Sequence, residues 1–212
     1  MNRFAHIVAN TLSILFYPLF IPTYGMVLFC VAYSVHVMPL PLIWSLVAVI
    51  GTFVLTCLLP ISAIWWLIRR GVVSDMQITN APERTVPYIY TLLGFGFWSY
   101  LMIAVLHAPV FMAYIAVGAT VTIGLVAVIN RFWKISAHLT GVGGLLGGVL
   151  CYCLGISAIP TWGTLIGWLL FSLLLMYARL YLQAHTSAQV CVGWLLGISC
   201  TFLPYSIACY VG

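Results

Sequence analysis

The chain has 212 residues, of which 65% are hydrophobic and only 4% are charged, and its formal net charge is +5. A soluble domain carries about 25% charged residues, so this chain cannot cover a water-exposed surface and most of it must lie in lipid. No polar, proline- and serine-rich or highly charged linker divides the sequence. We therefore expect one integral membrane domain over residues 1–212.

Seven apolar stretches approach or exceed the length of about 20 residues that a helix needs to cross a bilayer. In chain order they cover residues 11–35, 42–68, 87–106, 109–130, 136–156, 161–182 and 188–210. The first has no clear cleavage site, so we interpret it as a span and not as a signal peptide. Its Pro18 and Pro22 predict a kink or a partly interfacial segment. The sequence therefore predicts an all-α, polytopic transmembrane bundle of six to seven spans.

The charged residues gather at one end of this predicted bundle. The clusters are Arg69, Arg70, Asp75, Glu83 and Arg84 after the second stretch, Arg131 and Lys134 after the fourth, and Arg179 at the end of the sixth. Two spans separate neighbouring clusters, so all three emerge on the same membrane face, together with Arg3. The loops on the opposite face carry no lysine, arginine, aspartate or glutamate.

Two interpretations fit this clustering. Basic loops can simply mark the cytoplasmic side of a membrane protein. Alternatively, the three loops form one site for an anionic ligand. His138 lies beside Lys134, and His185 lies beside Arg179, on the same face. Topology alone does not require these pairs, and they favour the interpretation as a site.

The second cluster precedes a predicted helix that begins near Ser136. A serine at the N-cap leaves free backbone N–H groups in the first helical turn, and such groups attract phosphate. Lys134 adds a positive charge, and His138 can give or take a proton. The glycines that follow include two G-x-x-x-G pairs, which are typical of close helix packing in lipid.

The third cluster joins the last two spans. Arg179 closes one span, His185 follows a short turn, and Thr186 or Ser187 can cap the next helix. Gln189 lies one turn beyond His185, so its side-chain oxygen can accept an imidazole N–H. Arg84, from the first cluster, supplies a second guanidinium, whose fork of donors suits phosphate oxygens.

The second and third clusters resemble motifs of the type 2 phosphatidic acid phosphatase superfamily of membrane lipid phosphatases. Ser136 and His138 match its Pro-Ser-Gly-His motif, with Ala137 in place of the glycine. Arg179, His185 and Gln189 reproduce the spacing of its third motif, in which the last residue is an aspartate. Ala178 stands where that motif has a serine.

The first motif of the superfamily is matched more weakly. Arg84 takes the place of its arginine, but Gln77 stands where its lysine should be and Thr85 replaces its proline. Lys134 is the residue that can substitute for the missing lysine. The resemblance covers roughly residues 69–193 and depends mainly on the third motif.

The resemblance implies metal-independent hydrolysis of a lipid phosphate monoester or diphosphate. His185 would attack phosphorus to form a phosphohistidine, Gln189 would orient it, and His138 would protonate the leaving alkoxide and later activate water. The groups expected to hold the phosphate are Arg84, Arg179, Lys134, Gln77 and backbone N–H groups near Ser136 and Ala137. The alternative is a catalytically inactive protein of the same fold that binds or transports anionic lipids.

The expected partners are a membrane lipid phosphate and the bilayer, with no nucleic acid. No cluster supplies the carboxylates, thiolates or multiple histidines of a divalent metal site, so we expect neither a metal nor a cofactor. We expect the protein in a bacterial inner (plasma) membrane. The charge bias alone would place the site on the cytoplasmic face, whereas many bacterial relatives in the resembled family work on the outer face of that membrane. Because we interpret these charges as catalytic, we expect the site on the outer face.

Overall fold

The computed structural model of the chain describes residues 3–76, 78, 81–156 and 162–211. The chain is 82% helical and its described residues form no strand, which confirms the predicted all-α class. The α-helices are α1 (Arg3–Leu15), α2 (Ile21–His36), α3 (Leu42–Phe53), α4 (Leu59–Arg69), α5 (Thr85–Ala104), α6 (Val110–Ile129), α7 (Ala137–Cys151), α8 (Trp162–Tyr181) and α9 (Ser187–Val211). Two π-helical turns, η1 (Val54–Leu58) and η3 (Tyr152–Ile156), and a 3₁₀ turn, η2 (Ala81–Arg84), complete them.

Six segments of the described chain are long and apolar enough to cross a bilayer. They are Leu42–Arg69, Thr85–Ala104, Val110–Ile129, Ala137–Leu154, Trp162–Tyr181 and Ser187–Ile207. Each corresponds to one of the predicted stretches. The chain is therefore an integral membrane helix bundle with six long apolar spans, the lower number of the predicted six to seven.

The first predicted stretch, residues 11–35, is not one continuous helix. A turn at residues 16–20 divides it between α1 and α2, and α2 has only 16 residues. Pro18 lies in this turn, where its ring disfavours helical geometry in the residue before it. Pro22 lies in the first turn of α2, a position that tolerates proline because its missing N–H has no helical partner there.

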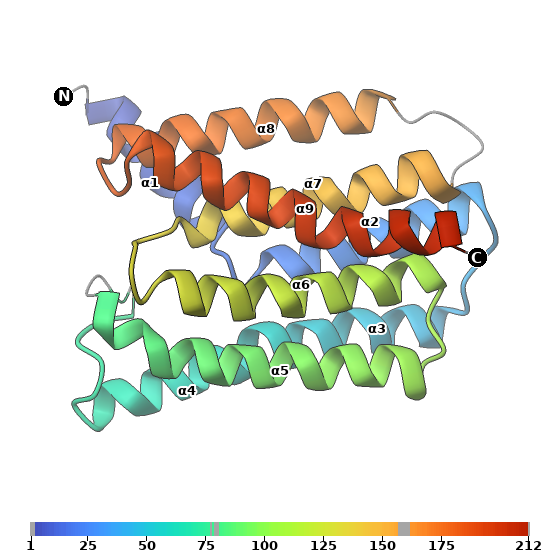
Figure 1. Cartoon of the computed structure of the whole chain (residues 1–212), viewed down its shortest axis with the longest axis horizontal. Helices are drawn as coiled ribbons and strands as arrows, with labels where there is room; N and C mark the ends of the chain where they lie inside the picture. The colour runs from blue at the N-terminus through green and yellow to red at the C-terminus, as the bar shows by residue number, and fades with distance from the viewer. Residues whose placement is uncertain (1–2, 77, 79–80, 157–161, 212) are drawn as a thin grey trace.

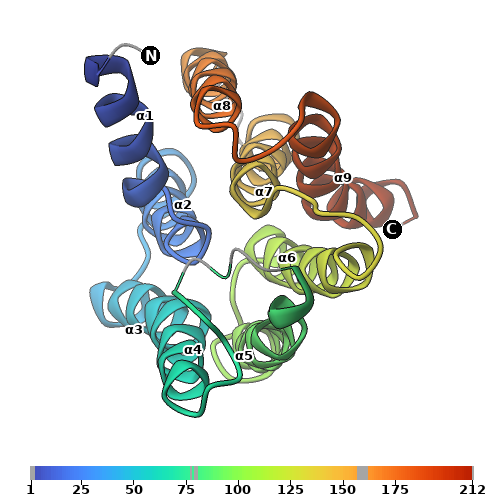
Figure 2. The same ribbon diagram turned by 90° about the vertical axis from the view of Figure 1, so that its left-hand side faces the viewer.

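The loops that carry the charged clusters lie at the same end of the bundle, as the count of spans predicts. Figure 1 shows the links that follow α4, α6 and α8 at one end, beside α1, and the links that follow α2 and α5 at the other end. Figure 2 looks onto the charged end, where α7 lies among α2, α6, α8 and α9. The three sequence clusters therefore meet around the start of α7.

α7 is the central span of the bundle. Within its 18-residue apolar window 61% is buried, compared with 17% to 39% in the other five spans. Glycines allow α9 to approach closely: a Cβ on Gly143 would meet the Trp194 carbonyl, and one on Gly197 would meet the Thr140 carbonyl. This confirms that the glycine pairs serve close helix packing. The packing also brings the first turns of α7 and α9 together.

Candidate functional site

The turn between α8 and α9 is fixed by local hydrogen bonds. The Gln183 N–H donates to the Leu180 carbonyl at 2.9 Å, and the Ala184 N–H donates to the Arg179 carbonyl at 3.2 Å. This is the pattern of a Schellman motif, in which one residue after the helix is left-handed. Gln183 is that residue, with φ of 52°. The motif turns the chain so that His185 follows Arg179 within a single tight link.

The next helix begins with a capping box. The Gln189 N–H donates to Thr186 Oγ1 at 3.4 Å, and the Thr186 N–H donates to Gln189 Oε1 at 3.1 Å. Gln189 Oε1 also lies 3.2 Å from His185 Nδ1, which confirms the predicted contact. Because an amide oxygen only accepts, Nδ1 carries the hydrogen and Nε2 keeps the lone pair of the neutral ring.

His185 is held in the neutral form at pH 7. Burial lowers the pKa of His185 to about 4; the charges of Arg179 and Lys134 act in the same direction, and the Gln189 hydrogen bond opposes them. A neutral imidazole with its free lone pair on Nε2 is the nucleophilic form of histidine. The turn therefore presents a neutral imidazole whose tautomer is set by Gln189.

The residues around Ser136 link the second cluster to the third. α7 begins at Ala137, and Ser136 occupies the predicted N-cap position with φ of −85° and ψ of 102°. Its hydroxyl, however, makes no capping bond and is fully buried with no partner among the described residues. The Ser136 N–H donates to the Gln189 carbonyl at 3.3 Å. Ser136 therefore joins the two motifs, and the uncapped N–H groups of α7 begin at Ala137.

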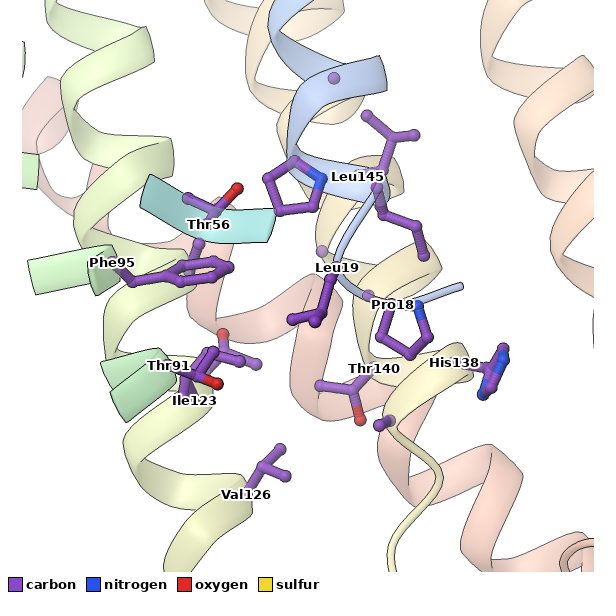
Figure 3. A pocket seen from close by; sticks show the side chains of 18 of the residues that line it. Pro18, Leu19, Thr56, Thr91, Phe95, Ile123, Val126, His138, Thr140 and Leu145 are labelled. Atoms are coloured by element: carbon purple, nitrogen blue, oxygen red, sulfur yellow. The ribbon is translucent and has the colours of Figure 1, made fainter. Parts of the chain in front are cut away.

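His138 is held by the N-terminal segment, a contact with no signal in the sequence motifs. Its Nε2 lies 3.1 Å from the carbonyl of Ser13 in α1, and the Tyr17 ring packs edge-on against it at 5.9 Å between centroids. In Figure 3 the ring points away from the labelled side chains of α5 and α6. Since a carbonyl accepts, Nε2 carries a hydrogen, and Nδ1 is the nitrogen left for a ligand.

Arg84 reaches the site from a longer, irregular link. Its Nε donates to the Ile78 carbonyl at 2.7 Å, and its Nη1 donates to Asn130 Oδ1 at 3.3 Å. Asn130 is the C-cap residue of α6 and is only 5% exposed. Sequence reasoning missed Asn130, although a polar residue where an apolar helix ends was an available signal. Gln77, the other residue predicted from this link, lies outside the described residues.

Five of the predicted residues line one cavity of about 240 Å³: Arg84, Ala137, His138, Arg179 and His185. The Nε atom of Arg179 is buried there and has no hydrogen-bond partner in the described part of the chain. A buried charged donor without a partner is costly, and an anion is the ligand that satisfies it. Lys134 lies nearby, and burial together with the charges of Arg84 and Arg179 lowers its pKa.

The donor set suits an anion better than a cation. Within residues 3–76, 78, 81–156 and 162–211, no three histidine, cysteine, aspartate or glutamate side chains come together as a metal site. Two arginines, a nearby lysine, free helix N–H groups and a neutral histidine can instead hold a phosphoryl group and attack it. No family model, curated protein or solved structure matches this chain. Its likeness to the phosphatase superfamily therefore rests on the motif residues themselves.

Proposed function

We propose that this chain is a lipid phosphate phosphatase that works without a metal, through a phosphohistidine on His185. The observation that carries the proposal is the buried Nε of Arg179, which has no partner among the described residues and lies in the same cavity as neutral His185. An oriented nucleophile beside an unsatisfied cation is the arrangement that phosphoryl transfer needs. The substrate class is a lipid phosphate monoester or diphosphate.

In the first step His185 Nε2 attacks phosphorus, and the bond between phosphorus and the lipid oxygen breaks. Arg84 and Arg179, with Lys134 nearby, stabilise the negative charge on the equatorial oxygens. A phosphate dianion beside His138 favours protonation of its second nitrogen, Nδ1, which then gives a proton to the leaving alkoxide. The products of this step are a lipid alcohol and phosphohistidine.

In the second step water attacks the phosphohistidine. His138 takes a proton from that water, the bond between Nε2 and phosphorus breaks, and inorganic phosphate leaves. Gln189 keeps the hydrogen on Nδ1 throughout, so the same nitrogen is free again for the next substrate. We further propose that the protein lies in a bacterial plasma membrane with this site on the outer face, as the resemblance implies.

A second candidate is an inactive protein that binds or transports anionic lipids with the same arginines. One observation favours it: the partner of His185 Nδ1 is the neutral amide of Gln189, which cannot stabilise positive charge on the ring as a carboxylate would. Binding without a phosphoenzyme would distinguish this candidate from the phosphatase.

The test is phosphate release by the purified protein from phosphatidic acid, phosphatidylglycerol phosphate, undecaprenyl diphosphate and lipid A phosphates, with acid quenching to trap phosphohistidine. We expect release that continues in EDTA, and loss of both release and trapping in His185→Ala. His36→Ala is the matched control, because His36 is exposed at the end of α2, away from the charged loops. Near-full turnover in His185→Ala would refute the mechanism, and lipid binding with neither release nor trapping would favour the binder.

A further inference from the structure

The cavity at the site continues deep into the bundle. Besides the charged residues it is lined by residues of the α1–α2 turn and of α2, α3, η1, α4, α5, α6, α7 and α9. Arg84, just before α5, and Trp98, within α5, both line it. Fourteen positions of helix separate them, or roughly 20 Å at 1.5 Å per residue. The phosphate-binding residues therefore lie at one end of a long, partly open cavity, which we call the channel.

Apart from the indole Nε1 of Trp98, which is buried with no hydrogen-bond partner among the described residues, the wall of this channel is apolar even where it contains threonines. The hydroxyls of Thr52, Thr56, Thr91 and Thr122 each donate to a carbonyl one turn earlier in the same span, at 2.7 to 2.8 Å. They consequently offer no free hydrogen to a ligand. Figure 3 shows Thr91 and Phe95 of α5 and Ile123 and Val126 of α6 on one side, facing Leu145 of α7 on the other. The surface suits a hydrocarbon.

The size of the channel limits what can occupy it. An apolar cavity of about 150 Å³ holds one benzene molecule. On that scale the volume of about 240 Å³ holds roughly ten carbon atoms. This is enough for the beginning of one apolar chain, and too little to hold both acyl chains of a diacylglycerol phosphate.

We propose that the channel takes up the first ten or so carbon atoms of a single apolar chain whose phosphate lies between Arg84 and Arg179. The protein then selects single-chain lipid phosphates, such as alkyl or prenyl phosphates, over diacyl ones. The inference rests on the proposed function only for the position of the headgroup. It differs from sideways binding at the lipid-facing surface, because the chain lies inside the bundle.

Photolabelling tests where the chain lies, whether or not turnover occurs. Hexadecyl phosphate with a diazirine near its sixth carbon is irradiated with the purified protein, and adducts are mapped by mass spectrometry. We expect labelling of Phe95 and Ile123, which line the channel. Leu93 and Phe97 lie on α5, like Phe95, but their side chains are 64% and 53% exposed, so adducts on them would place the diazirine outside the bundle. Adducts confined to Leu93, Phe97 and other exposed residues would overturn the inference.

A cavity-filling variant adds a functional measurement. Ala119→Phe places a ring in the channel, and Ala113→Phe, on the same helix but away from the channel, is the matched control. Burial of each methylene corresponds to roughly a three- to fourfold gain in kcat/KM, so the wild type should gain with chain length up to about ten carbons. Ala119→Phe should lose decyl phosphate activity at least about tenfold more than p-nitrophenyl phosphate activity, again on the scale of a few buried methylenes.

The two proposals fail in different ways. Phosphate release that does not depend on chain length, with equal losses on both substrates in Ala119→Phe, would overturn the channel and leave the phosphatase. Internal labelling that Ala119→Phe reduces, without release from any substrate, would support the channel and refute the phosphatase.

Discussion

Two links bring arginines to the site, and both follow a helix that ends in the same motif. After α4, the Gly71 N–H donates to the Ile68 carbonyl and the Val72 N–H to the Leu67 carbonyl, both at 3.0 Å. Gly71 adopts the left-handed φ of 70° that glycine tolerates at no steric cost. After α8 the same position is taken by Gln183, in a backbone conformation that disfavours residues with a Cβ.

The two links differ in how the chain continues beyond the motif. The α8–α9 link closes within three residues in a capping box, so hydrogen bonds between close neighbours in the sequence hold His185 next to Arg179. The α4–α5 link runs from residue 72 to residue 84, and Arg84 is positioned by bonds to Ile78 and Asn130. We therefore expect changes near the short link to lower kcat and changes near the long link to raise KM.

The largest effect is expected at His138. This residue lies two positions after Ser136, whose N–H donates to the Gln189 carbonyl and so joins the start of α7 to the short α8–α9 link. General acid catalysis contributes typically about 10²–10⁴-fold, so His138→Ala should lower kcat on alkyl phosphates by that order. p-Nitrophenolate is a good leaving group and needs little protonation, so activity on p-nitrophenyl phosphate should largely survive. Both substrates are measured at matched protein levels, with His36→Ala as control. Equal losses on both would remove His138 from this role.

The difference between the links also explains which parts of the site could be predicted. The contact of His185 with Gln189 depends on residues four apart across a helix start, and the sequence predicts it correctly. The common location of the three clusters follows from counting spans. His138 and Ser13, in contrast, are 125 residues apart, and their contact depends on how α1 packs against α8 and so reaches the start of α7. No pattern within either segment encodes that arrangement.

Ser136 shows a second way in which prediction from the sequence is limited. The position of Ser136 before α7 is predicted from its residue type, but its hydroxyl makes no capping bond. Close packing of α7 against α9 buries it completely. The internal channel was equally beyond prediction, because the threonines and apolar residues that line it come from helices all along the chain, from α2 to α9, which a single sequence cannot place side by side.

The second prediction concerns Gln189, which both caps α9 and orients His185. Gln189→Leu removes the acceptor, and the loss of one hydrogen bond of about 1.4 kcal/mol should lower kcat at least about tenfold. Thr186→Ala is the matched control, because it weakens the same cap and leaves Gln189 Oε1 for the histidine. It should lower Tm with little change in kcat. Full activity in Gln189→Leu would mean that His185 needs no orienting partner.

Gln189→Glu tests the contact between Gln189 and His185 through the pH dependence of kcat/KM. Only neutral His185 attacks phosphorus, so activity is lost as pH falls through its pKa, which is about 4 in the wild type. A carboxylate beside Nδ1 favours the imidazolium and raises that pKa. The acidic limb of the kcat/KM profile should therefore move to higher pH in Gln189→Glu. An unchanged limb would show that a group other than His185 controls it.

The smallest effect is expected at Arg84, which ends the long α4–α5 link. Its Nη1 donates to the neutral amide oxygen of Asn130, so the guanidinium is held while its charge is not neutralised. Asn130→Ala removes the acceptor for Nη1, but the bond from Nε to Ile78 remains, so the guanidinium is loosened and not lost. Loss of one hydrogen bond to a charged group should raise KM by up to about tenfold and leave kcat within about twofold. Asn130→Asp should raise KM further, because a carboxylate in the same place would pair with Arg84 and weaken its attraction for phosphate. The measurement is kcat and KM on one lipid phosphate, with Asn10→Ala, at an exposed position of α1, as control. A fall in kcat at unchanged KM in both variants would mean that Arg84 stabilises the transition state and not only the bound substrate. The expected difference between the α4–α5 link and the α8–α9 link would then be wrong.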